Sequence, residues 1–158
     1  MTINLDFSKL EAPDILDLAI FAEQEAKEHY EQIEGWMRSA GNAEAADFFH
    51  RMAELELSHK ETIEARRKAK YPEAPRRYTE TLAWDVETPD YSALDVSDMT
   101  LAKAFDAAIG AEDKAAEYYT EAIHYVDDEE IVTLFKELAQ AEVGHRNMLE
   151  AERRRLGV

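Results

Sequence analysis

Two stretches decide the fold of this chain: ELELSHKE at residues 54–61 and AEVGHRNM at residues 141–148. Each contains a glutamate followed three residues later by a histidine, Glu56 with His59 and Glu142 with His145. Residues three apart on a helix face the same side, so each pair presents two metal-binding groups together. A doubled pair of this kind predicts a four-helix bundle that holds two metal ions between its helices.

A further acid and a tyrosine precede each pair. Glu23 comes before the first pair and Glu112 before the second, and each is followed by six residues and then Tyr30 or Tyr119. The surroundings repeat as well. With an offset of 89 residues the region of Glu23 matches that of Glu112, and with an offset of 86 the two Glu-x-x-His regions match. The repeat predicts two similar helical hairpins related by a pseudo-two-fold axis.

Helical periodicity covers four long stretches, separated by residues that suit helix ends. Pro13 suits a first turn, Gly41 a helix stop, and Asn42 and Ser97 are candidate N-caps. The predicted helices span residues 13–40, 43–70, 98–126 and 129–156. We interpret residues 71–97, which contain three prolines, as a crossover. A helix of 28 residues is about 42 Å long, and an extended crossover can cover that length. The predicted fold is therefore an all-α bundle forming one domain over residues 1–158.

Composition restricts the function. The net charge of −17 argues against binding nucleic acid, and an acidic, solvated surface explains it. No apolar run is long enough to cross a membrane, and the first residues lack the pattern of a secretory signal, so we expect a cytoplasmic protein. The chain has no cysteine, so a metal must be held by carboxylate and imidazole groups.

The predicted ligand set balances two divalent cations. Four carboxylates in an apolar bundle would repel one another and be costly to desolvate, whereas two such ions neutralise them. We expect Glu56 and Glu142 to bridge the metals, with the other ligands terminal. A mixed oxygen and nitrogen set suits iron or manganese. The six predicted ligands are Glu23, Glu56, His59, Glu112, Glu142 and His145.

Other conspicuous residues have simpler interpretations. Tyr30 and Tyr119 are either core residues or supports for the ligands. The remaining histidines have no partner at a ligand spacing, so we interpret them as surface or packing residues; they are His29, His50 and His124. Six basic residues lie near the end of the second predicted helix, where helix capping and solubility explain them. These are Arg66, Arg67, Lys68, Lys70, Arg76 and Arg77.

The chain resembles the ferritin-like superfamily over nearly its whole length, and within it the rubrerythrin-like (erythrin) branch. The matching segments are AEQEAKEHY at residues 22–30, ELELSHKE, AEDKAAEYY at 111–119, and FKELAQAE running into AEVGHRNM at 135–148. The resemblance implies a ferritin-like bundle with a di-iron centre, usually in a paired assembly. It also implies reduction of hydrogen peroxide, or of dioxygen, in defence against oxidative stress.

Two departures from that pattern affect the expected reaction. Rubrerythrins usually carry a four-cysteine iron centre that delivers electrons, so this chain would need an external electron donor. They also usually have a further acid three residues after the third-helix ligand, and here that position is Ala115. The remaining set of four glutamates and two histidines resembles a bacterioferritin ferroxidase centre. Iron oxidation or storage is therefore an alternative function, and a metal-free helical interaction module is a second. We expect a homodimer, in which the crossover could permit helix exchange.

Overall fold

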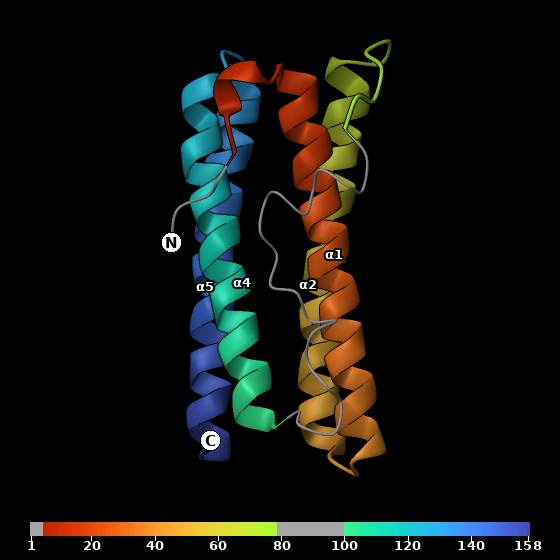
Figure 1. Cartoon of the computed structure of the whole chain (residues 1–158), viewed down its shortest axis with the longest axis vertical. Coiled ribbons are helices and arrows are strands. Elements are labelled where there is room, and N and C mark those ends of the chain that lie inside the picture. Colours follow the sequence, from red (N-terminus) through yellow and green to blue (C-terminus); the bar gives the residue numbers. More distant parts are fainter. Residues whose placement is uncertain (1–4, 79–99) are drawn as a thin grey trace.

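The computed structural model describes residues 5–78 and 100–158, and these form two antiparallel helical hairpins (Figure 1). One hairpin pairs α1 (Ala12–Ser39) with α2 (Ala43–Lys70). The other pairs α4 (Leu101–Ala122) with α5 (Glu129–Leu156). Short 3-10 helices lie before α1 (η1, Phe7–Lys9) and after α4 (η5, Ile123–Tyr125). The predicted all-α four-helix bundle is confirmed.

The order of the helices requires a long connection between the hairpins. Figure 1 shows that α2 ends where α1 begins, whereas α4 begins at the opposite end of the bundle. A crossover was predicted for residues 71–97, and residues 79–97 of that segment lie outside the described residues.

The hairpin turn between α1 and α2 follows the predicted capping chemistry. Pro13 lies in the first turn of α1, where its missing N–H has no intrahelical partner to lose. Gly41 has φ of +77°, which a residue without a Cβ adopts readily, and it reverses the chain after α1. The Asn42 side chain then accepts a hydrogen bond of 3.1 Å from the Ala45 amide. The N-cap of α2 was predicted correctly, and α1 spans residues 12–39 where 13–40 was predicted.

The boundaries of α4 differ from the prediction of 98–126. The helix begins at Leu101 because the Thr100 side chain accepts a 3.2 Å hydrogen bond from the Lys103 amide. The cap expected at Ser97 lies outside the described residues. The helix ends at Ala122, since the backbone tightens into η5 and becomes extended at Val126. This early end lets Asp128 cap α5, where its side chain accepts hydrogen bonds from two backbone amides.

The core consists of two apolar clusters, one toward each end of the bundle. The first contains buried residues from the N-terminal halves of α1 and α5 and from the C-terminal half of α4. Its large members include Tyr118, Tyr119 and Phe135. The second contains residues from the other halves, including Phe49 and Phe105. In every helix the residues between the two clusters include a buried glutamate. The fold thus places a layer of acidic groups between two apolar layers.

Arg67 does more than the helix capping and solubility that were predicted for it. It is 4% exposed, and it donates hydrogen bonds from Nε and Nη2 to the two oxygens of buried Asp17, at 2.9 and 3.2 Å. Its guanidinium also donates to the carbonyls of Tyr71 and Ala74. A guanidinium has five donors in a fixed planar geometry, so one side chain can join α1, the end of α2 and the following turn.

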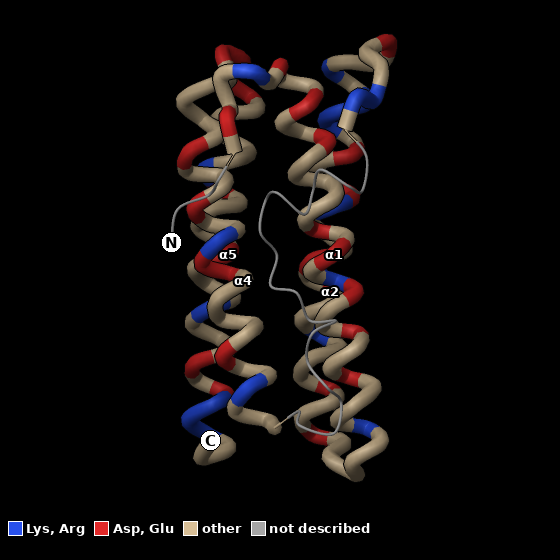
Figure 2. Tube along the Cα trace, in the orientation of Figure 1, with Lys and Arg blue, Asp and Glu red and all other residues tan. Residues whose placement is uncertain are grey.

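The charges are spread over the whole bundle. Figure 2 shows acidic residues along all four helices rather than on one of them. Such a distribution fits the interpretation of a solvated acidic surface. Within the described residues, no helix is both long enough and apolar enough to cross a membrane.

Candidate metal centre

The six predicted ligands lie together at the middle of the bundle. Glu23 comes from α1 and Glu112 from α4, while α2 and α5 each contribute a Glu-x-x-His pair. The four glutamates are between 0 and 3% exposed. Carboxylates are rarely buried without a partner, because removing the charge from water costs several kcal/mol. Their shared burial makes this layer the candidate functional centre.

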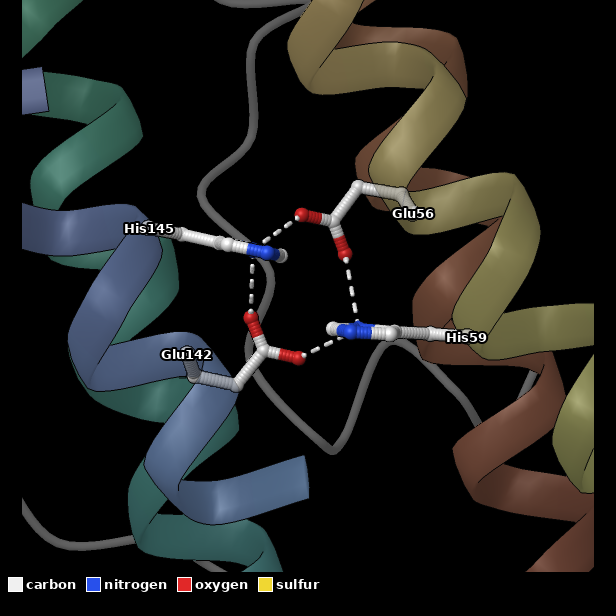
Figure 3. Close-up of side chains that lie close together, drawn as sticks. All are labelled: Glu56, His59, Glu142 and His145. Atoms are coloured by element: carbon white, nitrogen blue, oxygen red, sulfur yellow. Dashed lines mark hydrogen bonds and ion pairs between the residues drawn. The ribbon is translucent and has the colours of Figure 1, made fainter. Parts of the chain in front are cut away.

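The two Glu-x-x-His pairs contact each other across the hairpins (Figure 3). The His59 Nδ1 lies 3.1 Å from Oε1 of Glu142, and the His145 Nδ1 lies 2.9 Å from Oε1 of Glu56. The second oxygen of each carboxylate faces the other imidazole, at 3.2 Å for Glu142 to His145 and 3.8 Å for Glu56 to His59. Each carboxylate therefore spans both imidazoles, as a bridging ligand requires.

The two imidazole rings are stacked at the centre. Their centroids are 5.0 Å apart and their planes differ by 9°. One potential ligand atom from each of Glu56, His59, Glu142 and His145 lies within 4.8 Å of all the others. His145 is buried and His59 is partly exposed, with 15% of its side chain accessible. The group is compact enough to share metal ions.

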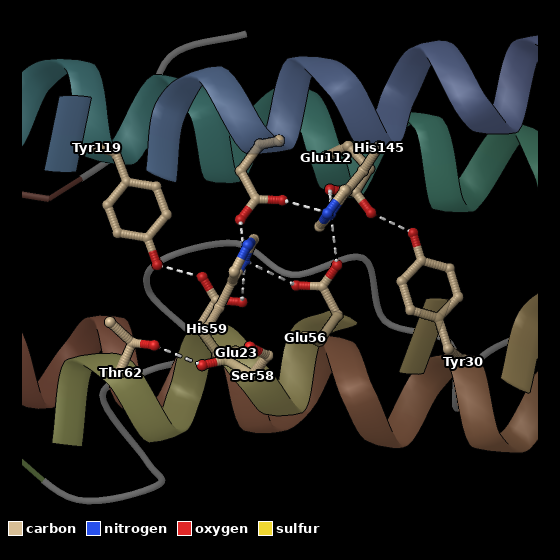
Figure 4. Close-up of polar contacts among 10 residues, drawn as sticks. Glu23, Tyr30, Glu56, Ser58, His59, Thr62, Glu112, Tyr119 and His145 are labelled. Carbon is tan, nitrogen blue, oxygen red and sulfur yellow. Dashed lines mark hydrogen bonds and ion pairs between the residues drawn. The ribbon is translucent and has the colours of Figure 1, made fainter. Parts of the chain in front are cut away.

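Glu23 and Glu112 complete the layer, and each is held by a tyrosine of the opposite hairpin (Figure 4). The Tyr119 hydroxyl donates a hydrogen bond to Oε1 of Glu23, and the Tyr30 hydroxyl donates one to Oε1 of Glu112. The other oxygen of each glutamate faces a histidine, with Oε2 of Glu23 lying 3.6 Å from the His59 Nδ1. The equivalent distance from Glu112 to His145 is also 3.6 Å. The arrangement therefore repeats the pseudo-two-fold symmetry of the sequence.

Burial and neighbouring charges shift the pKa values of Glu56, Glu142 and His145 toward protonation. Burial raises the pKa of Glu142 well above its usual range, and the charge of Glu23 adds to this effect. Burial also raises the pKa of Glu56, with the neighbouring carboxylates contributing. Burial opposes the protonation of His145, but contacts with Glu112, Glu142 and Glu56 outweigh it and raise its pKa to about 12. Metal binding would displace such protons, because the ligands must be deprotonated.

The residues present fit a pair of divalent cations. Within the described part of the chain, Oε2 of Glu142 is buried and accepts no hydrogen bond, although the His145 Nδ1 lies 3.2 Å away. A buried acceptor left unpaired is costly, and a metal ion would supply the missing partner. Four carboxylates carry the charge that two divalent cations neutralise. The mixture of hard oxygen and imidazole nitrogen donors suits iron or manganese.

The structure brings together every residue that the sequence predicted for the site, and their ligation of metal stays a prediction. The sequence did not decide whether Tyr30 and Tyr119 are core residues or supports for the ligands. In the structure they donate hydrogen bonds to Glu112 and Glu23. Sequence reasoning missed a cavity beside the centre, of which His29 lines one wall. The internal repeat could have indicated this cavity, because it has alanine at matching positions of α1 and α4.

The fold and the site define a helical protein that gathers four buried glutamates and two histidines into one layer, with a Glu/His cluster compatible with a dimetal site. The chain belongs to the rubrerythrin family, whose model matches residues 14–153. An uncharacterized conserved protein from Magnetospirillum magnetotacticum MS-1 has a similar structure, with a TM-score of 0.74 and 25% identity over 92% of this chain and 95% of its own. A hypothetical protein from Pyrococcus furiosus shares the fold, with a TM-score of 0.72 and 24% identity over 94% and 93% of the two chains. No curated protein of known function matches the sequence.

The tyrosine contacts lead to a prediction about metal affinity. Tyr119→Phe or Tyr30→Phe removes the hydrogen bond that orients a terminal glutamate. We expect the affinity for ferrous iron to fall by about 10–100-fold, the usual effect of losing a partner of a ligand. Titration of the metal-free protein with a competing chelator measures this affinity.

Tyr118→Phe is the matched control. Tyr118 is equally buried and adjacent to Tyr119, but its hydroxyl donates to the Ile15 carbonyl at 2.6 Å rather than to a ligand. Its loss should lower stability while leaving the affinity for iron unchanged. Equal affinities in all three variants would show that the tyrosines only fill the core.

Proposed function

We propose that this protein is a di-iron carboxylate oxidoreductase that reduces hydrogen peroxide. The observation that supports this most strongly is the crossed contact between the two Glu-x-x-His pairs, in which Glu56 and Glu142 each span both imidazoles. A centre of this shape would hold two ions close together, so that both face one small substrate. Membership of the rubrerythrin family agrees with this proposal.

The chemistry requires only electrons, protons and a fixed site. Ferrous ions held by the four glutamates and two histidines would supply the two electrons that, with two protons, convert one hydrogen peroxide into two waters. The chain's own residues keep the four carboxylates in place, with Tyr30 and Tyr119 orienting Glu112 and Glu23. Two apolar clusters enclose the layer on either side. Low water content strengthens the electrostatic interactions between the carboxylates and bound cations.

The electrons for a second turnover must come from another molecule. The sequence has no cysteine, so it contains no cysteine-ligated iron centre of its own. We propose an external electron donor and a homodimeric state, in an intracellular setting where such a donor is present. Manganese could occupy the same ligands, and the visible spectrum of the oxidised protein distinguishes it from iron.

The proposal predicts which oxidant reacts with the reduced protein. In stopped-flow mixing, the diferrous protein should be oxidised by one equivalent of hydrogen peroxide at least about tenfold faster than by dioxygen at the same concentration. The absorbance of the diferric form reports the rate. The control is the same concentration of ferrous iron in buffer without protein.

The ligand set also favours a second function. Four glutamates and two histidines, with Ala115 in place of a further acid, suit oxidation of ferrous iron as a substrate. The same mixing experiment separates the two functions. If dioxygen reacts much faster than hydrogen peroxide, the peroxide reductase proposal is wrong and iron oxidation is the better description.

A further inference from the structure

One cavity lies directly beside the candidate metal centre, between α1 and α4. All four site glutamates line it, together with Tyr30 and Tyr119, whereas neither His59 nor His145 does. The histidines come from α2 and α5, so they occupy the opposite side of the centre. Any ligand position that the protein leaves open on a bound metal pair would therefore face this cavity.

Besides the glutamates, the tyrosines, His29 and Lys114, four small side chains line the cavity. Ala22 and Ala26 come from α1, and Ala111 and Ala115 come from α4. All four are partly exposed, so the wall extends from the buried carboxylates toward the surface. A methyl group is the smallest side chain that maintains a helix well, because glycine costs about 1 kcal/mol in a helix interior. Alanine thus leaves the largest space that a stable helix permits.

The internal repeat that relates the predicted ligands also relates the four alanines of the cavity wall. The offset of 89 residues that relates Glu23 to Glu112 also relates Ala22 to Ala111 and Ala26 to Ala115. The cavity is therefore built by equivalent residues of both hairpins, as the metal centre is. Space that results from one irregular contact would not show this correspondence.

The size of the cavity limits what it can hold. Its volume is about 40 Å³, whereas a single water needs at least about 10–15 Å³ by the same measure. Two or three linked atoms therefore fit, but a branched alkyl group does not. Because the alanine wall is apolar, entry of a small neutral molecule is favoured over entry of a charged one.

We infer that this alanine-walled cavity is the binding site for the oxidant and that it selects unsubstituted hydrogen peroxide over alkyl hydroperoxides. The inference rests on the proposed function for the identity of the substrate. Its structural content, a small-molecule site bounded by Ala26 and Ala115, is independent of any reaction. Ala115 then has a definite role, because a longer side chain at this position would occupy the space where the oxidant binds.

The first test needs no metal. Crystals of the metal-free protein under xenon pressure should contain a xenon atom between Ala26 and Ala115, since xenon enters small cavities with apolar walls. Ala115→Leu should abolish this binding. Ala116→Leu is the matched control, because Ala116 is the next residue of α4 and does not line the cavity. Absence of xenon from the wild-type protein, or its retention in Ala115→Leu, would overturn the inference.

The second test compares two oxidants on the diferrous protein. Hydrogen peroxide should react at least about 100-fold faster than tert-butyl hydroperoxide, since a pocket rejects additional carbons by steric exclusion. Ala115→Leu should retain the wild-type metal content and slow the reaction with hydrogen peroxide by at least about tenfold. Ala116→Leu should react as the wild type does.

The outcomes distinguish the inference from the proposed function. Equal rates with both oxidants would refute the selectivity while leaving the peroxide reductase function intact. If neither oxidant reacts although xenon binds as expected, the proposed function is wrong and the cavity remains a small-molecule site. If Ala115→Leu fails to fold, Ala26→Val tests the same wall from α1 with a smaller increase in volume.

Discussion

The wild-type protein supplied with ferrous iron is expected to carry about two metal ions per chain, whereas Glu142→Gln is expected to carry one or none. Glu142 contacts both imidazoles, through Oε1 to His59 and Oε2 to His145. Glutamine keeps the shape of the side chain but lacks the charge that a bridging ligand provides. The change should therefore remove the link between the two halves of the centre. Elemental analysis after removal of excess iron measures the result.

The same variant should lose most of the stability gained from metal. A ligand that binds only the folded state adds about 4 kcal/mol at a concentration 1,000-fold above its Kd. The wild-type Tm should therefore rise strongly with iron, and the Tm of Glu142→Gln should rise little. Without metal the substitution should cost little, because burial already raises the pKa of Glu142 and favours its uncharged form.

Glu137→Gln is the control for this experiment. Glu137 lies on the same helix, is exposed, and is not part of the ligand group. It should bind metal and respond to it as the wild type does. If Glu142→Gln retains two metals with the wild-type rise in Tm, its assignment as a bridging ligand is wrong.

Arg67→Met is expected to lower the free energy of unfolding by about 3–5 kcal/mol. The guanidinium and the Asp17 carboxylate are both buried, with side-chain exposures of 5% and 2%. Removing the cation leaves Asp17 buried near an exposed cation, Arg76, whose Nη1 is 3.9 Å away. The carbonyls of Tyr71 and Ala74 also lose a donor. Urea denaturation of metal-free protein measures the change without a contribution from the metal site.

Two further variants separate loss of the ion pair from loss of packing. Arg66→Met removes a neighbouring cation that pairs with exposed Glu130 at 3.1 Å, and it should cost at most about 1 kcal/mol. Arg67→Met combined with Asp17→Leu removes both charges and should recover much of the lost stability. A single variant Arg67→Met as stable as Arg66→Met would contradict the importance of the buried pair.

The residues that the fold gathers at its centre could be named from the sequence because the relevant information is local. Glu56 and His59 must share a helix face wherever that helix lies, and the same holds for Glu142 and His145. The internal repeat then showed that Glu23 and Glu112 belong to the same set. Caps at Asn42 and Gly41 were also predictable, since they depend on backbone chemistry within a few residues.

Three features were not predicted. Helix capping and solubility were expected to explain Arg67, yet its partner Asp17 lies 50 residues earlier in the chain. The end of α4 was placed too late because η5 and the turn after it are needed for Asp128 to cap α5. The cavity was missed because alanines on a helix are typical of many packing surfaces.

The sequence by itself determined four helices, two equivalent hairpins and six potential ligands, because helical periodicity and an internal repeat are both readable along a single chain. Only the tertiary structure decided that each histidine contacts the glutamate of the opposite hairpin, as His59 does with Glu142. It likewise decided that each tyrosine supports the opposite glutamate, and that the alanines of α1 and α4 leave a cavity between them. These features join residues about 80 to 100 positions apart, so they depend on how the two hairpins pack rather than on the sequence of either hairpin.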